Sequence, residues 1–176
     1  MTSHKHALAN GGSLFLALPI FASYARAQTF TTLYTFDGVN GAVLPNAVVI
    51  GGGGVLYGTS YGGGSASSDG TVFSLTPPGI PGGPWTETVL SSLTGADGIR
   101  PLDGVAIGSG GVLYATAFVG GLPDNGGTVF SSTPPQGGSA APGDPWTLSV
   151  LHSFKHDVGG GFESGTSVVI GGGGVL

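Results

Sequence analysis

The fold of this chain is decided by a motif that occurs twice. Residues 53–59 read Gly-Gly-Val-Leu-Tyr-Gly-Thr, and residues 110–116 read Gly-Gly-Val-Leu-Tyr-Ala-Thr, a shift of 57 positions. The same shift places residues 70–78, Gly-Thr-Val-Phe-Ser-Leu-Thr-Pro-Pro, over residues 127–135. Motifs that recur in the same order at one spacing indicate an internal repeat.

A third copy of the repeat follows with a longer spacing. Pro-Trp-Thr at 84–86 recurs at 145–147, and the apolar triplet 105–107 recurs at 168–170, so the shift grows to 61 and then 63. The extra residues fall in stretches rich in Gly, Pro and Asp, as expected when insertions occur in loops. The sequence stops inside the third copy, and we therefore expect about two and a half repeats over residues 28–176, truncated at the C-terminus.

Each copy contains four short runs of β-branched and aromatic residues separated by turn residues. In the first copy these runs are 46–50, 55–60, 71–76 and 85–93, and no stretch shows helical periodicity. The pattern predicts an all-β fold of tandem four-stranded antiparallel repeats, which is a partial β-propeller, with a β-solenoid as the alternative. Residues 29–36 match the fourth run, and we expect them to complete the last blade of a closed propeller.

The first residues have the features of a secretory signal. His4 and Lys5 form a basic start, residues 14–24 are largely apolar, and Ala-Arg-Ala at 25–27 is an A-x-A cleavage site. We therefore predict a signal peptide over residues 1–27 and an exported protein, extracellular or on the cell surface. The apolar stretch is shorter than the roughly 20 residues that cross a bilayer, so we expect no membrane span in the mature chain.

The composition excludes several classes of partner and chemistry. After cleavage, Arg100 and Lys155 are the remaining basic residues against nine acidic ones. Such a surface cannot neutralise nucleic acid or an anionic membrane, because both require clustered Lys and Arg. The chain has no cysteine, which excludes disulfides, thiolate metal sites and cysteine nucleophiles. A surface glycan or an extracellular protein is the partner that we expect.

Three motifs of the first repeat together resemble a known family. Residues 56–63 (LYGTSYGG), 70–73 (GTVF) and 84–90 (PWTETVL) resemble the GloVer (Gloeo_Verruco) tandem-repeat family, and the resemblance extends over essentially everything after the signal peptide. It implies a bacterial extracellular or surface protein, often with a C-terminal anchor of varying type, and it defines no catalytic residues. The chain departs from the pattern at Ala115, Ala117 and Ser132.

Two patterns invite an enzymatic or metal-binding interpretation. Residues 58–62 satisfy the G-x-S-x-G pattern of a serine hydrolase, but no helix follows Ser60 and the next repeat has Ala117 there, so we expect a strand end. His152, His156 and Asp157 form a candidate metal set. Because His152 aligns with Tyr34 and Ser91, an exposed strand position is the alternative.

Asp37, Asp97 and Asp157 recur in the loop that follows the fourth run of each copy. Asp is common in such loops as a turn former. In a closed propeller these loops surround one face, and a ring of carboxylates is also the chemistry of a calcium site. Calcium is therefore the candidate ion, and we expect no other cofactor.

Trp85 and Trp146 follow Pro at equivalent positions. Exposed, they would stack on sugar rings and bind a ligand; the alternative is burial between neighbouring blades. Together these patterns predict a non-enzymatic exported repeat protein that serves as a binding or structural module. The alternative is a secreted propeller enzyme acting on polysaccharide, with its active site outside this segment.

The signal peptide gives a first prediction. We expect the protein recovered after export to begin at Gln28, and intact-mass spectrometry measures this directly. A mature chain that retains residues 14–24 would show instead that the segment is an uncleaved anchor.

Overall fold

A computed structural model describes residues 29–38, 43–64, 68–135, 144, 146–155 and 167–176. The chain divides into two compact units, Met1–Thr31 and Thr32–Leu176. The predicted signal peptide lies outside the described residues.

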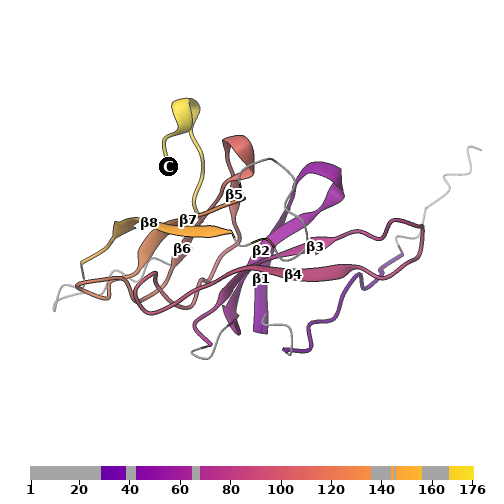
Figure 1. Ribbon diagram of the computed structural model, residues 1–176, viewed down its shortest axis with the longest axis horizontal. Helices are drawn as coiled ribbons and strands as arrows, with labels where there is room; N and C mark the ends of the chain where they lie inside the picture. Colours follow the sequence, from indigo (N-terminus) through magenta and orange to yellow (C-terminus); the bar gives the residue numbers. More distant parts are fainter. Residues whose placement is uncertain (1–28, 39–42, 65–67, 136–143, 145, 156–166) are drawn as a thin grey trace, which may run out of the picture. The chain divides into compact units, whose positions relative to one another are not determined.

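The second unit contains two four-stranded antiparallel sheets, in each of which the strand order equals the chain order (Figure 1). Within the described residues there is no α-helix and neither a closed propeller nor a solenoid. The predicted all-β fold of tandem four-stranded repeats is confirmed. The strands of the first sheet are β1 (Val43–Ile50), β2 (Leu56–Gly62), β3 (Thr71–Thr76) and β4 (Thr86–Ser92), and those of the second are β5 (Ala106–Ile107), β6 (Leu113–Ala117), β7 (Thr128–Thr133) and β8 (Thr147–Ser153).

The strands pair in the same register within each of the two sheets. Leu56 pairs with Leu75 in the first sheet, and Leu113 pairs with Ser132 at the equivalent place in the second. Both fourth strands also contain a β-bulge at the same position, which makes Leu90 and Leu151 the extra residues. A bulge turns the side chains of its strand. Because the bulge recurs, equivalent residues of the two fourth strands point to the same side of their sheets.

The glycine-rich connection 51–54 forms a single 3-10 turn that all three copies contain. The third residue of the connection, Gly53, Gly110 or Gly173, has a positive φ of 66°, 69° and 82° respectively, a backbone conformation that favours glycine. In each copy the turn is closed by the same 2.8 Å backbone hydrogen bond, donated by Gly51, Gly108 and Gly171 to the carbonyls of Val55, Val112 and Val175. The third copy therefore begins with the same local structure as the first two.

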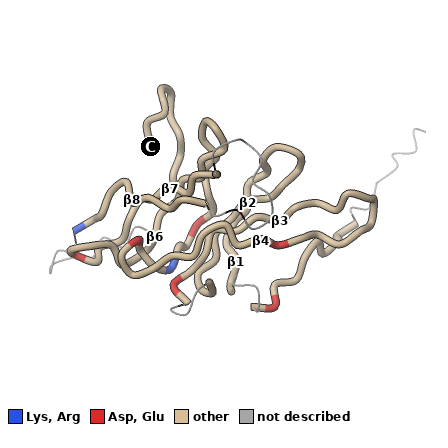
Figure 2. Tube along the Cα trace, in the orientation of Figure 1, with Lys and Arg blue, Asp and Glu red and all other residues tan. Residues whose placement is uncertain are grey.

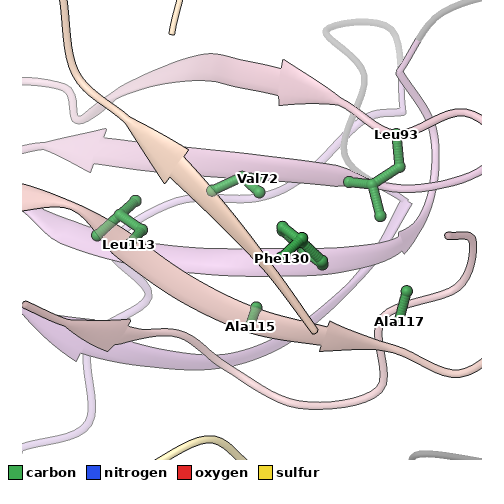
Figure 3. Packing of buried hydrophobic residues seen from close by; sticks show 6 residues of the cluster. All are labelled: Val72, Leu93, Leu113, Ala115, Ala117 and Phe130. Carbon is green, nitrogen blue, oxygen red and sulfur yellow. The ribbon is translucent and has the colours of Figure 1, made fainter. Parts of the chain in front are cut away.

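The core lies between the two sheets. We call the side of each sheet that carries Phe73 or Phe130 its Phe face, and the opposite side, which carries Tyr57 or Tyr114, its Tyr face. The Phe face of the second sheet packs on the Tyr face of the first (Figure 3). The buried cluster consists of Val72 and Leu93 from the first repeat with Leu113, Ala115, Ala117 and Phe130 from the second.

A buried pair of hydroxyls replaces an apolar contact in this core. Ser132 of the second repeat is equivalent to Leu75 of the first, and Leu75 packs in one cluster with Tyr34. Ser132 is fully buried, and its Oγ lies 2.8 Å from the Oγ of Ser91, which occupies the position equivalent to Tyr34. Two small hydrogen-bonded side chains thus fill the place that two large ones fill one repeat earlier. This accounts for the departure at Ser132.

The serine pair gives a second prediction. Replacing Ser132 by Ala leaves the buried Ser91 hydroxyl without this partner, and we expect the free energy of unfolding to fall by about 1–3 kcal/mol. The double variant Ser91→Ala/Ser132→Ala should recover part of the loss, because neither hydroxyl is then buried without its partner. Urea unfolding of the four proteins measures the coupling, and strictly additive effects would contradict a direct hydrogen bond.

Candidate functional site

Asp97 forms the turn that follows β4. Its carboxylate accepts a 2.6 Å hydrogen bond from Thr94 Oγ1, and its backbone carbonyl accepts one of 2.7 Å from Thr128 Oγ1. The next residue, Gly98, has a φ of 103°, and a β-carbon there would meet Ala117 and Thr128 of the second sheet. Asp97 therefore stabilises the tight loop that connects the first repeat to the second. This is the turn-forming role that the sequence analysis gave as the common role of Asp in such loops.

The other two predicted aspartates do not join Asp97 in a described metal site. Asp37 is exposed and borders a hollow of about 420 Å³, lined also by Phe36 and residues 43–45. Asp157 lies outside the described residues. In the part of the chain that the structure describes, no group of three or more His, Asp or Glu side chains could hold a metal ion.

Of the candidate metal set His152, His156 and Asp157, the structure describes His152 alone. The His152 ring lies at the end of β8 and packs edge-on against Phe154, with ring centroids 4.7 Å apart. His156 and Asp157 are outside the described ranges. His152 itself is an exposed strand residue, as the alternative interpretation of its position required.

Ser60 is a structural hydroxyl of β2. It is fully buried, it donates a 2.7 Å hydrogen bond to the carbonyl of Gly62, and its Oγ lies 2.7 Å from Thr71 Oγ1. A nucleophile elbow exposes its serine at a turn from a strand into a helix. The strand position and burial of Ser60 do not have that geometry.

Both tryptophans pack against core clusters. Trp85 is half-buried against Phe73 and Leu75. Trp146 packs at the edge of the cluster between the sheets, and its ring centroid lies 6.3 Å from that of Tyr57 in the preceding repeat. These contacts favour the packing interpretation over a sugar-stacking surface.

A hydrogen-bond network that the sequence patterns did not predict connects β1 and β2 to the loop between the sheets. Asn46 Nδ2 donates to Thr59 Oγ1 at 2.9 Å and to the carbonyl of Pro101 at 2.7 Å. Thr59 Oγ1 donates in turn to the carbonyl of Asp103. Asp103 aligns with Asn46 under the 57-residue shift. The alignment of these two polar residues was the signal available in the sequence.

The loops at the end of the sheets where β2 and β4 finish form a connected surface. Backbone hydrogen bonds link the loop after β4 to the loop after β6, from Ile99 to Val119 at 2.8 Å and from Gly121 to Gly95 at 2.9 Å. Arg100 donates its backbone N–H to Asp69, and its guanidinium carbon lies 5.6 Å from the centroid of the Tyr61 ring. Charged residues are sparse along the described chain (Figure 2).

Comparisons of this chain with protein-family models, with curated proteins and with solved structures each find no match. The resemblance to the GloVer family stays a prediction that rests on the motifs quoted above. Across the described residues, none of the helices has the length and apolar character needed to cross a membrane.

The geometry of Asp97 gives a third prediction. Asp97→Ala removes the acceptor of the Thr94 hydrogen bond and should lower stability by about 0.5–1.5 kcal/mol, whereas Asp97→Asn keeps an acceptor oxygen and should lose less. We expect the Tm values of the unaltered protein, Asp97→Asn and Asp97→Ala to fall in this order, both with millimolar calcium and with a chelator. A calcium-dependent rise in Tm that both variants abolish would assign Asp97 to a calcium site instead.

Proposed function

We propose that this chain belongs to an exported, non-enzymatic repeat protein of propeller type, which binds a surface glycan or an extracellular protein through the connected loops at one end of its sheets. The observation that carries the proposal is the way in which consecutive repeats pack. Both described sheets are antiparallel meanders, and the Phe face of the second packs on the Tyr face of the first.

This packing favours the propeller over the solenoid. Propeller blades are four-stranded antiparallel sheets that pack face to face in chain order. In a β-solenoid, strands pair mainly with their equivalents in neighbouring repeats. Here every strand of the two sheets pairs with a strand of its own repeat, and the β-bridge that links the two repeats, Ile99 with Val119, joins loops rather than strands.

The chemistry of the loop surface supports a neutral or basic partner. The loops at this end carry two described cations, Arg100 and Lys155. Five aspartates belong to the same loops: Asp37, Asp69, Asp97, Asp103 and Asp124. Such a surface repels phosphate groups and suits uncharged sugars or a basic protein. The non-enzymatic part of the proposal is supported by the burial of Ser60 and by the turn-forming role of Asp97.

The test uses two exposed apolar residues at opposite ends of the sheets. Leu122 is 66% exposed in the loop after β6, and Ile80 is 71% exposed in the loop after β3. We expect the protein to bind members of a glycan panel without releasing product. Leu122→Ser should weaken binding several-fold, while the matched control Ile80→Ser should leave it unchanged.

Two outcomes would contradict the proposal. Weakening by Ile80→Ser alone would move the binding surface to the other end of the sheets. Product release from a bound polysaccharide would favour the secreted propeller enzyme.

A further inference from the structure

Four residues other than glycine have a positive φ within the described residues, and all four lie at the end of the sheets where β2 and β4 finish. These residues are Leu44, Ser68, Arg100 and Asn125, with φ from 54° to 57°. In the turns described at the opposite end, glycine occupies the positive-φ positions, as at 53–54, 82 and 110–111. A left-handed backbone costs a residue with a side chain free energy that glycine avoids. Such strain is retained where the surrounding structure holds it, and it gathers at binding sites.

The left-handed conformation recurs at equivalent positions while the side chain changes. Leu44 and Arg100 each stand directly before a proline at the start of a repeat. Ser68 and Asn125 are equivalent under the 57-residue shift. Glycine would suit all four backbones, yet the chain carries a different side chain at each. A fixed backbone with a variable side chain is typical of loop positions that recognise a ligand.

The backbone of Arg100 is held on both sides. Its N–H donates a 2.8 Å hydrogen bond to the carbonyl of Asp69, and its own carbonyl accepts one of 3.3 Å from the N–H of Phe118. The next residue, Pro101, is buried, and its carbonyl accepts the 2.7 Å hydrogen bond from Asn46 Nδ2. The exposed side chain of Arg100 is therefore presented from a rigid backbone, which lowers the entropic cost of binding.

The Arg100 side chain forms a pair with Tyr61 of the preceding repeat, which we call the Arg–Tyr pair. Its guanidinium carbon lies 5.6 Å from the centroid of the half-buried Tyr61 ring, so that the cation lies over the ring face. Among the described residues the guanidinium has no carboxylate partner, and its N–H donors are available to a ligand. The loop after β4 and the end of β2 supply the pair, so the first two repeats complete it.

The charges around the Arg–Tyr pair decide which kind of ligand fits it. Aspartates outnumber cations in these loops, and Asp69 adjoins the pair through its hydrogen bond with the Arg100 backbone. Their carboxylates repel an acidic sugar or a phosphate, and Arg100 itself repels a basic protein side chain. An uncharged sugar ring avoids both penalties, because its adjacent hydroxyl oxygens can accept the parallel N–H donors of a guanidinium. The pair therefore suits a neutral sugar.

We propose that Arg100 binds one uncharged sugar unit of a surface glycan by donating two hydrogen bonds to adjacent hydroxyl oxygens, and that Tyr61 positions its guanidinium. This inference rests on the proposed function, and it names the ligand class and the residues that bind it on the same loop surface. It selects the glycan over the extracellular protein as the partner. The left-handed backbone of Arg100, held at both its N–H and its carbonyl, fixes the direction from which the guanidinium meets the sugar.

Isothermal titration calorimetry of the full chain, purified after export, tests the assignment with neutral gluco-, manno- and galacto-oligosaccharides and with oligogalacturonate as the acidic probe. Arg100→Ala should weaken binding of the neutral ligand roughly ten-fold, because hydrogen bonds from a charged donor are lost. Arg100→Lys should weaken it nearly as much, because an ammonium group lacks the planar fork. Lys155→Ala is the matched control, since Lys155 is the other described cation of these loops, and it should leave the affinity unchanged.

Variants at both members of the pair separate recognition from folding. Arg100→Gly relieves the left-handed strain, so its Tm should exceed that of Arg100→Ala while its affinity is equally low. Tyr61→Leu removes the ring under the guanidinium and should weaken binding several-fold. Tyr61→Phe keeps the ring and should bind like the unaltered chain, which a role of the Tyr61 hydroxyl in binding would not allow.

The outcomes distinguish this inference from the proposed function. If neutral oligosaccharides bind and Leu122→Ser weakens that binding but folded Arg100→Ala does not, the proposed function stands and the role of Arg100 is wrong. Tighter binding of oligogalacturonate than of every neutral ligand would overturn the ligand class. If no oligosaccharide of the panel binds, this inference is overturned, and the proposed function is left with an extracellular protein as its partner.

Discussion

The rest of the structure depends on the packing of one repeat's Phe face against the preceding repeat's Tyr face. A four-stranded meander with apolar side chains on both sides cannot bury them by itself, so each sheet needs a neighbour. Phe130 and Val72 meet in this contact with no exposed surface. The recurring bulge in the fourth strand and the glycine turn place equivalent side chains at equivalent points, so that one contact can repeat along the chain.

The described polar contacts between the two repeats are hydrogen bonds of hydroxyl and amide groups rather than ion pairs of charged residues. Only 7% of the residues are charged, and the described contacts between the repeats contain hydrogen bonds from Ser, Thr and Asn. Ser91 with Ser132, Thr128 with Asp97, and Asn46 with Pro101 each join the two repeats. Because a buried hydroxyl without a partner costs free energy, these pairs also fix the register of one sheet on the other.

The side chains that looked most like site residues serve this architecture. Asp97 closes a turn, Ser60 is buried between Gly62 and Thr71, and Trp146 packs beside Tyr57. What varies between the copies is mainly loop length and loop composition. A scaffold that repeats while its loops vary is the usual arrangement when binding resides in the loops. For this reason our functional proposal rests on the loop surface.

The sequence by itself determined the period, the strand class, the extent of β3 and the glycine turns, because alternation and turn chemistry are local properties of a chain. It predicted β1 to begin at Asn46, whereas the strand extends back to Val43. Only the tertiary structure decided which face packs on which, that Ser91 meets Ser132 across 41 residues, and that Asn46 reaches Pro101 across 55. Periodicity indicates that a side chain is buried but does not specify its partner. The same serine, aspartate or tryptophan is compatible with a turn, a core or a ligand site, and the packing of the neighbouring repeat decides among them.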